Sequence, residues 1–170
     1  ITLMPTNLYG SGDNYTNNTS HVFAALIRRF YEAKIEKLKR VTCWGTGFPK
    51  REFLHVDDLG DATVFVLENW QPNKEDSPRN ANGKKLCHLN VGTGIDITIK
   101  ELAESIASQI GYEGEIKWDI SKPDGTPRKL LNIDRIKKLG WEPKISLKNG
   151  IRDTCKLFKK NHLERNFKYE

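Results

Sequence analysis

The stretch LCHLNVGTGIDITIKELAESIASQIG, residues 86–111, decides the fold class of this chain. Its first part reads as a short strand that ends in the glycine turn Gly-Thr-Gly at 92–94. In its second part Thr98 and Glu101 have the spacing of a capping box, and Gly111 ends an amphipathic run. The apolar positions of that run recur at helical spacing: Ile99, Leu102, Ala103, Ile106 and Ile110. A strand, a glycine turn and an amphipathic helix in this order predict an α/β fold.

The rest of the chain alternates strands and helices in the same way. We expect further strands at 1–7, 40–45, 51–56 and 115–120. A first helix should bury the stripe Val22, Ala25, Leu26, Phe30 and Ala33. We expect helices to begin at caps with short polar side chains, namely Thr19 or Ser20 for the first, Asp57 for the second and Ser146 for the last. In this interpretation His21 lies in the first turn of its helix.

Composition is typical of a single globular domain. At 170 residues the chain can bury about 70% of its unfolded surface. Its 28 Lys and Arg against 22 Asp and Glu give a net charge of +6, which favours an acidic ligand without choosing between nucleic acid, phosphate esters and lipid. No apolar run could span a bilayer and no signal peptide is visible, so we expect a cytoplasmic protein without membrane contacts. The chain begins in mid-strand, so we expect it to be part of a longer protein.

Three cysteines argue against a disulfide framework or a metal site. Cys43, Cys87 and Cys155 are odd in number, far apart and without Cys-x-x-Cys spacing. We interpret them as buried thiols. The segment 71–85 is rich in Pro, Asn, Lys and Gly, which indicates a surface insertion.

Two loops combine glycine and proline with cations: GTGFPKRE at 45–52 and SKPDGTPRK at 121–129. Glycine allows the backbone to approach a ligand, and arginine offers the fork of donors that phosphate oxygens accept. Two such loops could clamp a diphosphate. Each cation taken singly, Lys50, Arg51, Arg128 or Lys129, could equally be a solvated surface charge.

Three further side chains are candidates for the same site. Arg29 lies at the edge of the apolar stripe of its helix, where a cation needs a carboxylate, solvent or a bound phosphate as its partner. His21 follows a long polar loop and could exchange a proton in a cleft, or be a surface histidine. Trp44 could stack on a ring or belong to the core.

Five segments in order resemble the GDP-L-fucose synthases, a family of extended short-chain dehydrogenases: PTNLYG (5–10), SHVFAALIRRF (20–30), WGTGFPKREFLHVDDL (44–59), LNVGTGIDITI (89–99) and SKPDGTPRKLLNIDRIKKLGWEP (121–143). The resemblance implies an NADP-dependent enzyme that epimerises GDP-4-dehydro-6-deoxy-D-mannose at C3 and C5 and reduces C4 to give GDP-L-fucose. It also implies that residues 1–170 form the C-terminal substrate lobe plus the last strands and helices of a Rossmann-type parallel sheet. The cofactor-binding N-terminal half would be absent.

The resemblance also assigns roles to residues. Arg51 and Lys129 would contact the GDP diphosphate, and the other substrate contacts would be Arg29, Trp44 and Asp124. The nicotinamide end of NADP would lie along Pro5, Thr6, Asn7 and Leu8. His21 would touch NADP and serve as an acid/base partner in epimerisation. The family's partner cysteine and its Tyr-x-x-x-Lys pair match nothing here, so we expect this chain alone to be inactive and the full-length protein to be a homodimer.

Two other functions remain open on the sequence. One is another NAD(P)-dependent nucleotide-sugar epimerase or dehydratase that uses no histidine at position 21. The other is a basic nucleic-acid-binding module, although the cations are interleaved with acidic residues and no recognition helix is visible.

Overall fold

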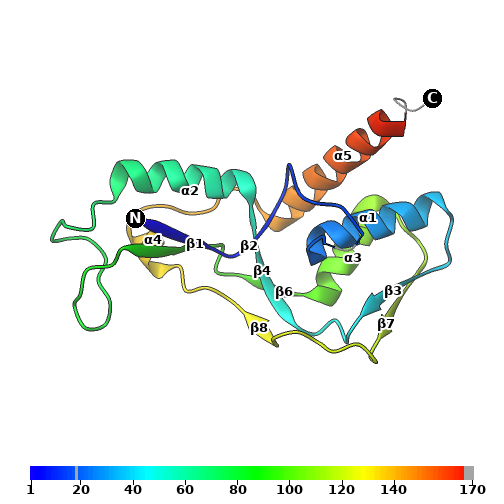
Figure 1. Cartoon of the computed structure of the whole chain (residues 1–170), viewed down its shortest axis with the longest axis horizontal. Coiled ribbons are helices and arrows are strands. Elements are labelled where there is room, and N and C mark those ends of the chain that lie inside the picture. The colour runs from blue at the N-terminus through cyan, green and yellow to red at the C-terminus, as the bar shows by residue number, and fades with distance from the viewer. Residues whose placement is uncertain (18, 167–170) are drawn as a thin grey trace.

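The structure, a computed structural model, describes residues 1–17 and 19–166, with side chains described up to His162. Helices and strands alternate along these ranges (Figure 1). The elements are β1 (Thr2–Pro5), β2 (Asn7–Tyr9), α1 (Val22–Ile35), β3 (Arg40–Trp44), β4 (Lys50–His55), α2 (Val56–Asn69), β5 (His88–Val91), β6 (Asp96–Thr98), α3 (Ile99–Ile110), β7 (Glu115–Asp119), β8 (Arg128–Lys129), α4 (Asp134–Lys138) and α5 (Leu147–Asn166).

Strand β4 is the centre of the sheet structure. It pairs in parallel with β2 and β8 and antiparallel with β6. Two further parallel pairs, β1 with β5 and β3 with β7, lie apart from it. Parallel pairs connected through helices define an α/β fold, so the predicted fold class is confirmed.

Two hydrophobic clusters lie on opposite faces of β4. Phe53 belongs to the cluster formed with α1, α3 and α5, whereas Leu54 belongs to the cluster formed with α2, β5 and α4. Successive side chains of a strand point to opposite faces, so these neighbouring residues anchor both clusters to one strand. Figure 1 accordingly shows β4 between α1 and α3 on one side and α2 on the other.

The helix caps differ in part from the prediction. His21 is the N-cap of α1, in an extended conformation, so the prediction of Thr19 or Ser20 as the cap and of His21 in the first turn was wrong. His55 caps α2, because its Nδ1 accepts a hydrogen bond of 3.2 Å from the backbone N–H of Asp57. Asp57, which was predicted to be the cap, lies instead in the first turn, where its negative charge interacts favourably with the helix dipole.

Other predicted ends are confirmed. Thr98 and Glu101 form the capping box of α3, and Gly111 ends that helix with a left-handed φ of 76°. The backbone N–H of Asn149 donates to Ser146 Oγ at the start of α5.

The prediction of one strand over 1–7 was wrong, because β1 ends at Pro5 and a separate strand, β2, begins at Asn7. Strands β6 and β8 were not predicted, since they have only 3 and 2 residues and depend on pairing with β4.

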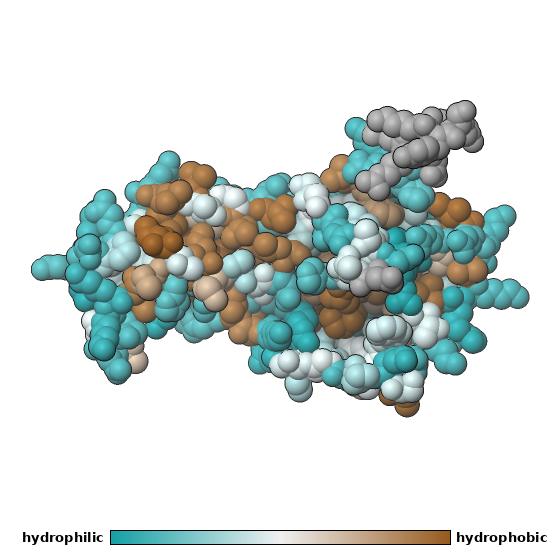
Figure 2. All heavy atoms as spheres, in the orientation of Figure 1, coloured by the Kyte–Doolittle hydropathy of each residue, from teal (hydrophilic) through white to brown (hydrophobic). Residues whose placement is uncertain are grey.

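The remaining predictions concern thiols and surface. Cys43 and Cys155 are buried as expected, but Cys87 is exposed. The segment 71–85 forms turns and one isolated bridge between Arg79 and Lys85, as a surface insertion does. Figure 2 shows apolar side chains over the region of α2, where Val64 and Leu67 are exposed. No helix in the described part of the chain is long and apolar enough to cross a bilayer.

Candidate functional site

A cavity of about 510 Å³ lies between the loop after β2 and the beginning of α1. We call it the His21 cavity. Its lining consists of Thr6, Asn7, Leu8, Tyr9, Gly10, Ser11, Gly12, Asp13, His21, Val22, Phe23, Phe53 and Val56. Three of the four predicted cofactor residues thus share one cavity with the predicted histidine. Pro5 is not among the lining residues.

The chain changes sheets at this cavity. β1 pairs with β5 up to Pro5, and β2 pairs with β4 from Asn7 onward, so Thr6 is the crossing point. The Thr6 hydroxyl and the Asn7 amide donate to the backbone carbonyl of Glu52, at 3.2 and 2.8 Å. Sites at which a parallel sheet divides are common places for ligand binding in α/β folds.

His21 is available for chemistry at the wall of the cavity. Its side chain is exposed and makes no cap hydrogen bond to α1. The opposite wall depends on Gly10, whose φ is 136° and whose Cβ would lie 2.9 Å from His55 Nε2. The phenol of Tyr9, by contrast, has a pKa raised above its usual range, first by burial and then by the charge of Asp58. Burial thus disfavours loss of the Tyr9 proton, whereas the exposed His21 side chain is open to a ligand in the cavity.

A second cavity of about 220 Å³ adjoins the first, and we call it the Arg51 cavity. It is lined by Asn7, Val22, Trp44, Gly47, Pro49, Arg51, Ile99, Pro123, Asp124 and Gly125. Asn7 and Val22 line both cavities, so the two are neighbours, and we call them together the cleft. Val22 was predicted to be buried with its helix face, but it is 37% exposed because it faces this cleft.

The two predicted loops meet at the Arg51 cavity. Asp124 accepts hydrogen bonds from the backbone N–H and the hydroxyl of Thr46, at 2.9 and 2.6 Å. These donors hold the pKa of the Asp124 carboxyl below its usual range. Gly45 is required beside them, since its φ is 78° and a Cβ would lie 2.3 Å from Asp124 Oδ1. Asp124 thus fastens loop 121–127 onto loop 45–49.

Arg51 reinforces this contact from strand β4. Its Nη1 donates to the carbonyl of Lys50 at 2.7 Å and to that of Thr126 at 2.6 Å. Its Nη2 lies close to Gly125, where an added Cβ would be 3.1 Å away. Arg51 therefore both holds loop 121–127 and presents donors to the cavity.

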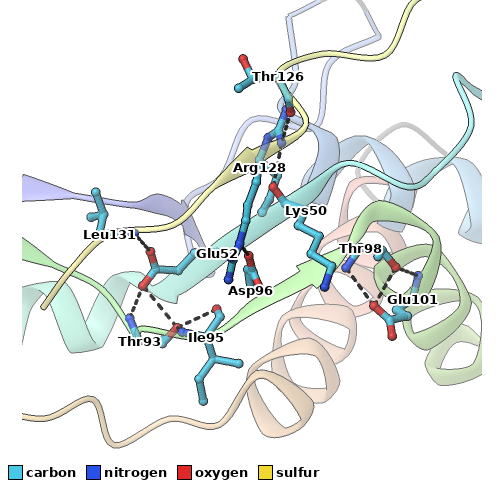
Figure 3. A network of polar contacts seen from close by, with 11 residues as sticks. Lys50, Glu52, Thr93, Ile95, Asp96, Thr98, Glu101, Thr126, Arg128 and Leu131 are labelled. Atoms are coloured by element: carbon cyan, nitrogen blue, oxygen red, sulfur yellow. Dashed lines mark hydrogen bonds and ion pairs between the residues drawn. The ribbon is translucent and has the colours of Figure 1, made fainter.

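Lys129 lies next to Arg51 across the sheet. The two are paired in register between β8 and β4, so their side chains leave the sheet on the same face. Among the described residues the Lys129 side chain has no hydrogen bond or ion pair; it is exposed, and the lining of neither cavity includes it. Like charges directly opposite each other in a sheet are unfavourable. The neighbouring pair Lys50 and Arg128 lies on the other face, where the charge of Arg128 is compensated because Arg128 donates to the carboxylate of Asp96 (Figure 3).

Trp44 presents a flat apolar surface at this cavity. It ends β3, and its side chain is 70% exposed, so it does not belong to the core. Lys122 Nζ lies 5.7 Å from the centre of its ring, within reach of a cation–π contact. A tryptophan exposed to this degree beside a cavity is suited to stack on a ring of a ligand.

Arg29 is placed differently from the other predicted residues. Its Nη2 donates to the backbone carbonyl of Thr42 on β3, and the described lining of neither cavity includes it. The protein partner of this cation is thus a backbone carbonyl, which was not among the partners predicted from the sequence, namely a carboxylate, solvent or a bound phosphate. A contact of Arg29 with substrate stays a prediction.

One buried residue next to the cleft was not predicted from the sequence. Glu52 is completely buried, and its carboxyl group accepts hydrogen bonds from the backbone N–H groups of Thr93, Gly94 and Leu131. The signal was present: in a strand, Glu52 falls on the same face as the apolar Leu54. A carboxylate on a buried face must find donors, which could have marked it.

Comparisons with known proteins agree with this architecture. Residues 1–91 match the model of the NAD dependent epimerase/dehydratase family, and the chain belongs to that family. A rice protein (Oryza sativa subsp. japonica) named probable GDP-L-fucose synthase 1 is 48% identical over 95% of this chain and 45% of its own length. The GDP-L-fucose synthase of Escherichia coli K12 is 48% identical over 94% of this chain and 48% of its own length. The chain spans about half the length of these relatives.

A solved structure shares the fold at high similarity. It is a GDP-6-OMe-4-keto-L-xylo-heptose reductase from C. jejuni, with a TM-score of 0.83 and 34% identity, and the match covers 95% of this chain and 54% of that one.

Proposed function

We propose that this chain forms the substrate-binding lobe of a GDP-L-fucose synthase. The observation that carries the proposal is the pairing of Arg51 and Lys129 on one face of the sheet, next to a cavity lined by Trp44. The Asp124 carboxylate of this cavity is already engaged by Thr46, and neither cation forms an ion pair among the described residues, so the two cations suit the two phosphates of a nucleoside diphosphate. The similarity to the rice and Escherichia coli proteins supports the choice of a GDP-sugar.

The cofactor in this proposal is NADP, and the His21 cavity fits its nicotinamide end. Its volume of about 510 Å³ suits a part of the cofactor rather than the whole molecule. The side chains of Thr6 and Asn7 are engaged with Glu52, which fixes their backbone along the cavity. Bound there, the cofactor would supply hydride for reduction of a sugar ketone.

His21 would act as one acid/base partner in epimerisation. Inverting a carbon next to a ketone needs one group that removes a proton and another that returns it from the opposite face. His21 faces the cleft, so it can serve as one of the two. The resemblance to the GDP-L-fucose synthases implies a cysteine as the second group, and neither the buried Cys43 and Cys155 nor Cys87 lines either cavity, so that cysteine would lie in another part of the full-length protein.

Calorimetric titration of the chain with GDP, GMP and guanosine tests the substrate class. We expect GMP to bind at least about tenfold more weakly than GDP, because losing one charge-assisted hydrogen bond costs about 1.5 kcal/mol or more. Guanosine binding as tight as GDP would contradict the proposal. A preference for UDP would favour a different nucleotide-sugar enzyme of the family, and a preference for duplex DNA that weakens steeply with salt would favour the nucleic-acid hypothesis.

A further inference from the structure

Strand β4 connects the cleft to three separate segments through a single residue. The backbone carbonyl of Glu52 accepts from Thr6 and Asn7, at the wall of the His21 cavity. Its carboxyl group lies on the opposite side of the strand from Arg51, among the buried residues. Figure 3 shows this group pointing from β4 towards Thr93 and Leu131.

The carboxyl group satisfies backbone donors that are distant in sequence. Oε1 accepts from the N–H groups of Thr93 and Gly94, at 2.6 and 2.7 Å. Oε2 accepts from the N–H of Leu131 at 2.9 Å. Both oxygens are therefore used, and three backbone donors would lose their partner without them.

The segment held by Oε2 directly follows Lys129, the neighbour of Arg51 in the sheet. Leu131 follows Lys129 by two positions, and Lys129 ends strand β8. β8 has only 2 residues, so its pairing with β4 alone contributes little to the stability of this segment. The hydrogen bond from Leu131 to Glu52 fixes the chain directly after β8, and with it the position of Lys129 opposite Arg51.

We infer that Glu52 is a positioning residue of the cleft. Its buried carboxyl group fixes the turn at Thr93 and Gly94 and the segment 129–131 against β4, and so sets the separation of Arg51 and Lys129. The inference rests on the proposed function for the identity of the ligand that these cations bind. The anchoring itself can be tested without a ligand.

The chain contains a matched control for this role. Asp58 on α2 is 2% exposed, and its two carboxyl oxygens accept from the backbone N–H groups of Lys144 and Ile145, both at 3.0 Å. It is thus a buried carboxyl group that anchors a distant segment, but the segment it holds is Lys144 and Ile145 rather than the chain that follows Lys129. Glu52→Gln and Asp58→Asn each place an amide where only acceptors fit, so both variants should lose stability.

GDP affinity separates the two variants when each is measured at a temperature where it is fully folded. We expect Glu52→Gln to weaken GDP binding about fivefold to thirtyfold, the effect of moving one cation away from a phosphate. Asp58→Asn should bind as the wild type does. Unchanged affinity in Glu52→Gln, or equal losses in both variants, would overturn the inference.

Amide hydrogen exchange gives a test that needs no ligand. In Glu52→Gln the amides of Thr93, Gly94 and Leu131 should exchange at least about tenfold faster, whereas Asp58→Asn should leave them unchanged. Unchanged exchange at these amides in Glu52→Gln would overturn the anchoring role. If wild-type chain fails to bind GDP, the proposed function fails, and this exchange measurement still decides the inference.

A second variant covers the case in which Glu52→Gln does not fold. Gly92 has no left-handed backbone, but an added Cβ would lie 2.2 Å from Glu52 Oε1. Gly92→Ala should therefore displace the carboxyl group without changing any charge, and weaken GDP binding in the same direction. Gly60→Ala is its control, because a Cβ there meets nothing within 4 Å. Equal GDP affinity in the two alanine variants would contradict the inference.

Discussion

Replacing Lys129 by methionine should change ligand binding without changing stability, whereas a change of Arg51 would also remove the hydrogen bond that holds Thr126. The side chain of Lys129 is exposed, and among the described residues it forms neither a hydrogen bond nor an ion pair. Methionine keeps a long flexible side chain and removes the charge. We therefore expect the free energy of unfolding to stay within about 0.5 kcal/mol of the wild-type value.

The expected loss in binding follows from Coulomb's law. One charge about 4 Å from a phosphate contributes about 1 kcal/mol in bulk water and about 4 kcal/mol in the partly shielded surroundings of a protein surface. Because Lys129 is exposed, we take about 1–2 kcal/mol, which corresponds to GDP binding weakened about fivefold to thirtyfold. The loss should shrink as salt is added, since screening weakens the contact in the wild type.

The assay is calorimetric titration with GDP, accompanied by urea denaturation of each variant. Lys148→Met is the control, because Lys148 is likewise exposed and lines neither cavity. It should leave both GDP affinity and stability unchanged. The reasoning is refuted if Lys129→Met binds GDP as tightly as the Lys148→Met control does.

Two further predictions concern the loop contact and the α3 cap. The Thr46 donors lower the pKa of Asp124, so the contact between the two loops should be present above the unfolded-state pKa of about 3.9 and be lost as the pH falls through the lower folded-state pKa. Tryptophan fluorescence measured against pH should follow this loss. A fluorescence titration identical to that of Asp124→Asn would contradict the prediction. Thr98→Ala removes the capping box and should lower the free energy of unfolding, measured by urea denaturation, by about 1 kcal/mol. An unchanged free energy of unfolding would contradict this prediction and mean that Glu101 caps the helix alone.

The sequence predicted those features that are encoded locally. The capping box at Thr98 and Glu101 and the helix end at Gly111 each depend on side chains a few positions apart, so the pattern alone identified them. Loops 45–52 and 121–129 were recognised by composition, and the structure brings Arg51 and Asp124 from them to one cavity, beside Trp44 at the end of β3.

Features that depend on tertiary pairing could not be predicted in this way. Strands β6 and β8 exist because β4 offers them backbone partners, and their own residues carry no strand pattern. Glu52 is intermediate, since the strand pattern marks its face but not the donors that it meets.

The central claim is that Arg51, which lines the Arg51 cavity, and Lys129, its neighbour in the sheet, together receive the diphosphate. Titration of ¹⁵N-labelled chain with GDP, followed by amide chemical shifts, tests it most directly. The account predicts that the amides of Thr46, Gly125 and Lys129 shift in parallel with GDP, while that of Lys148 stays unchanged. Saturable shifts confined to residues outside the cleft would contradict the account.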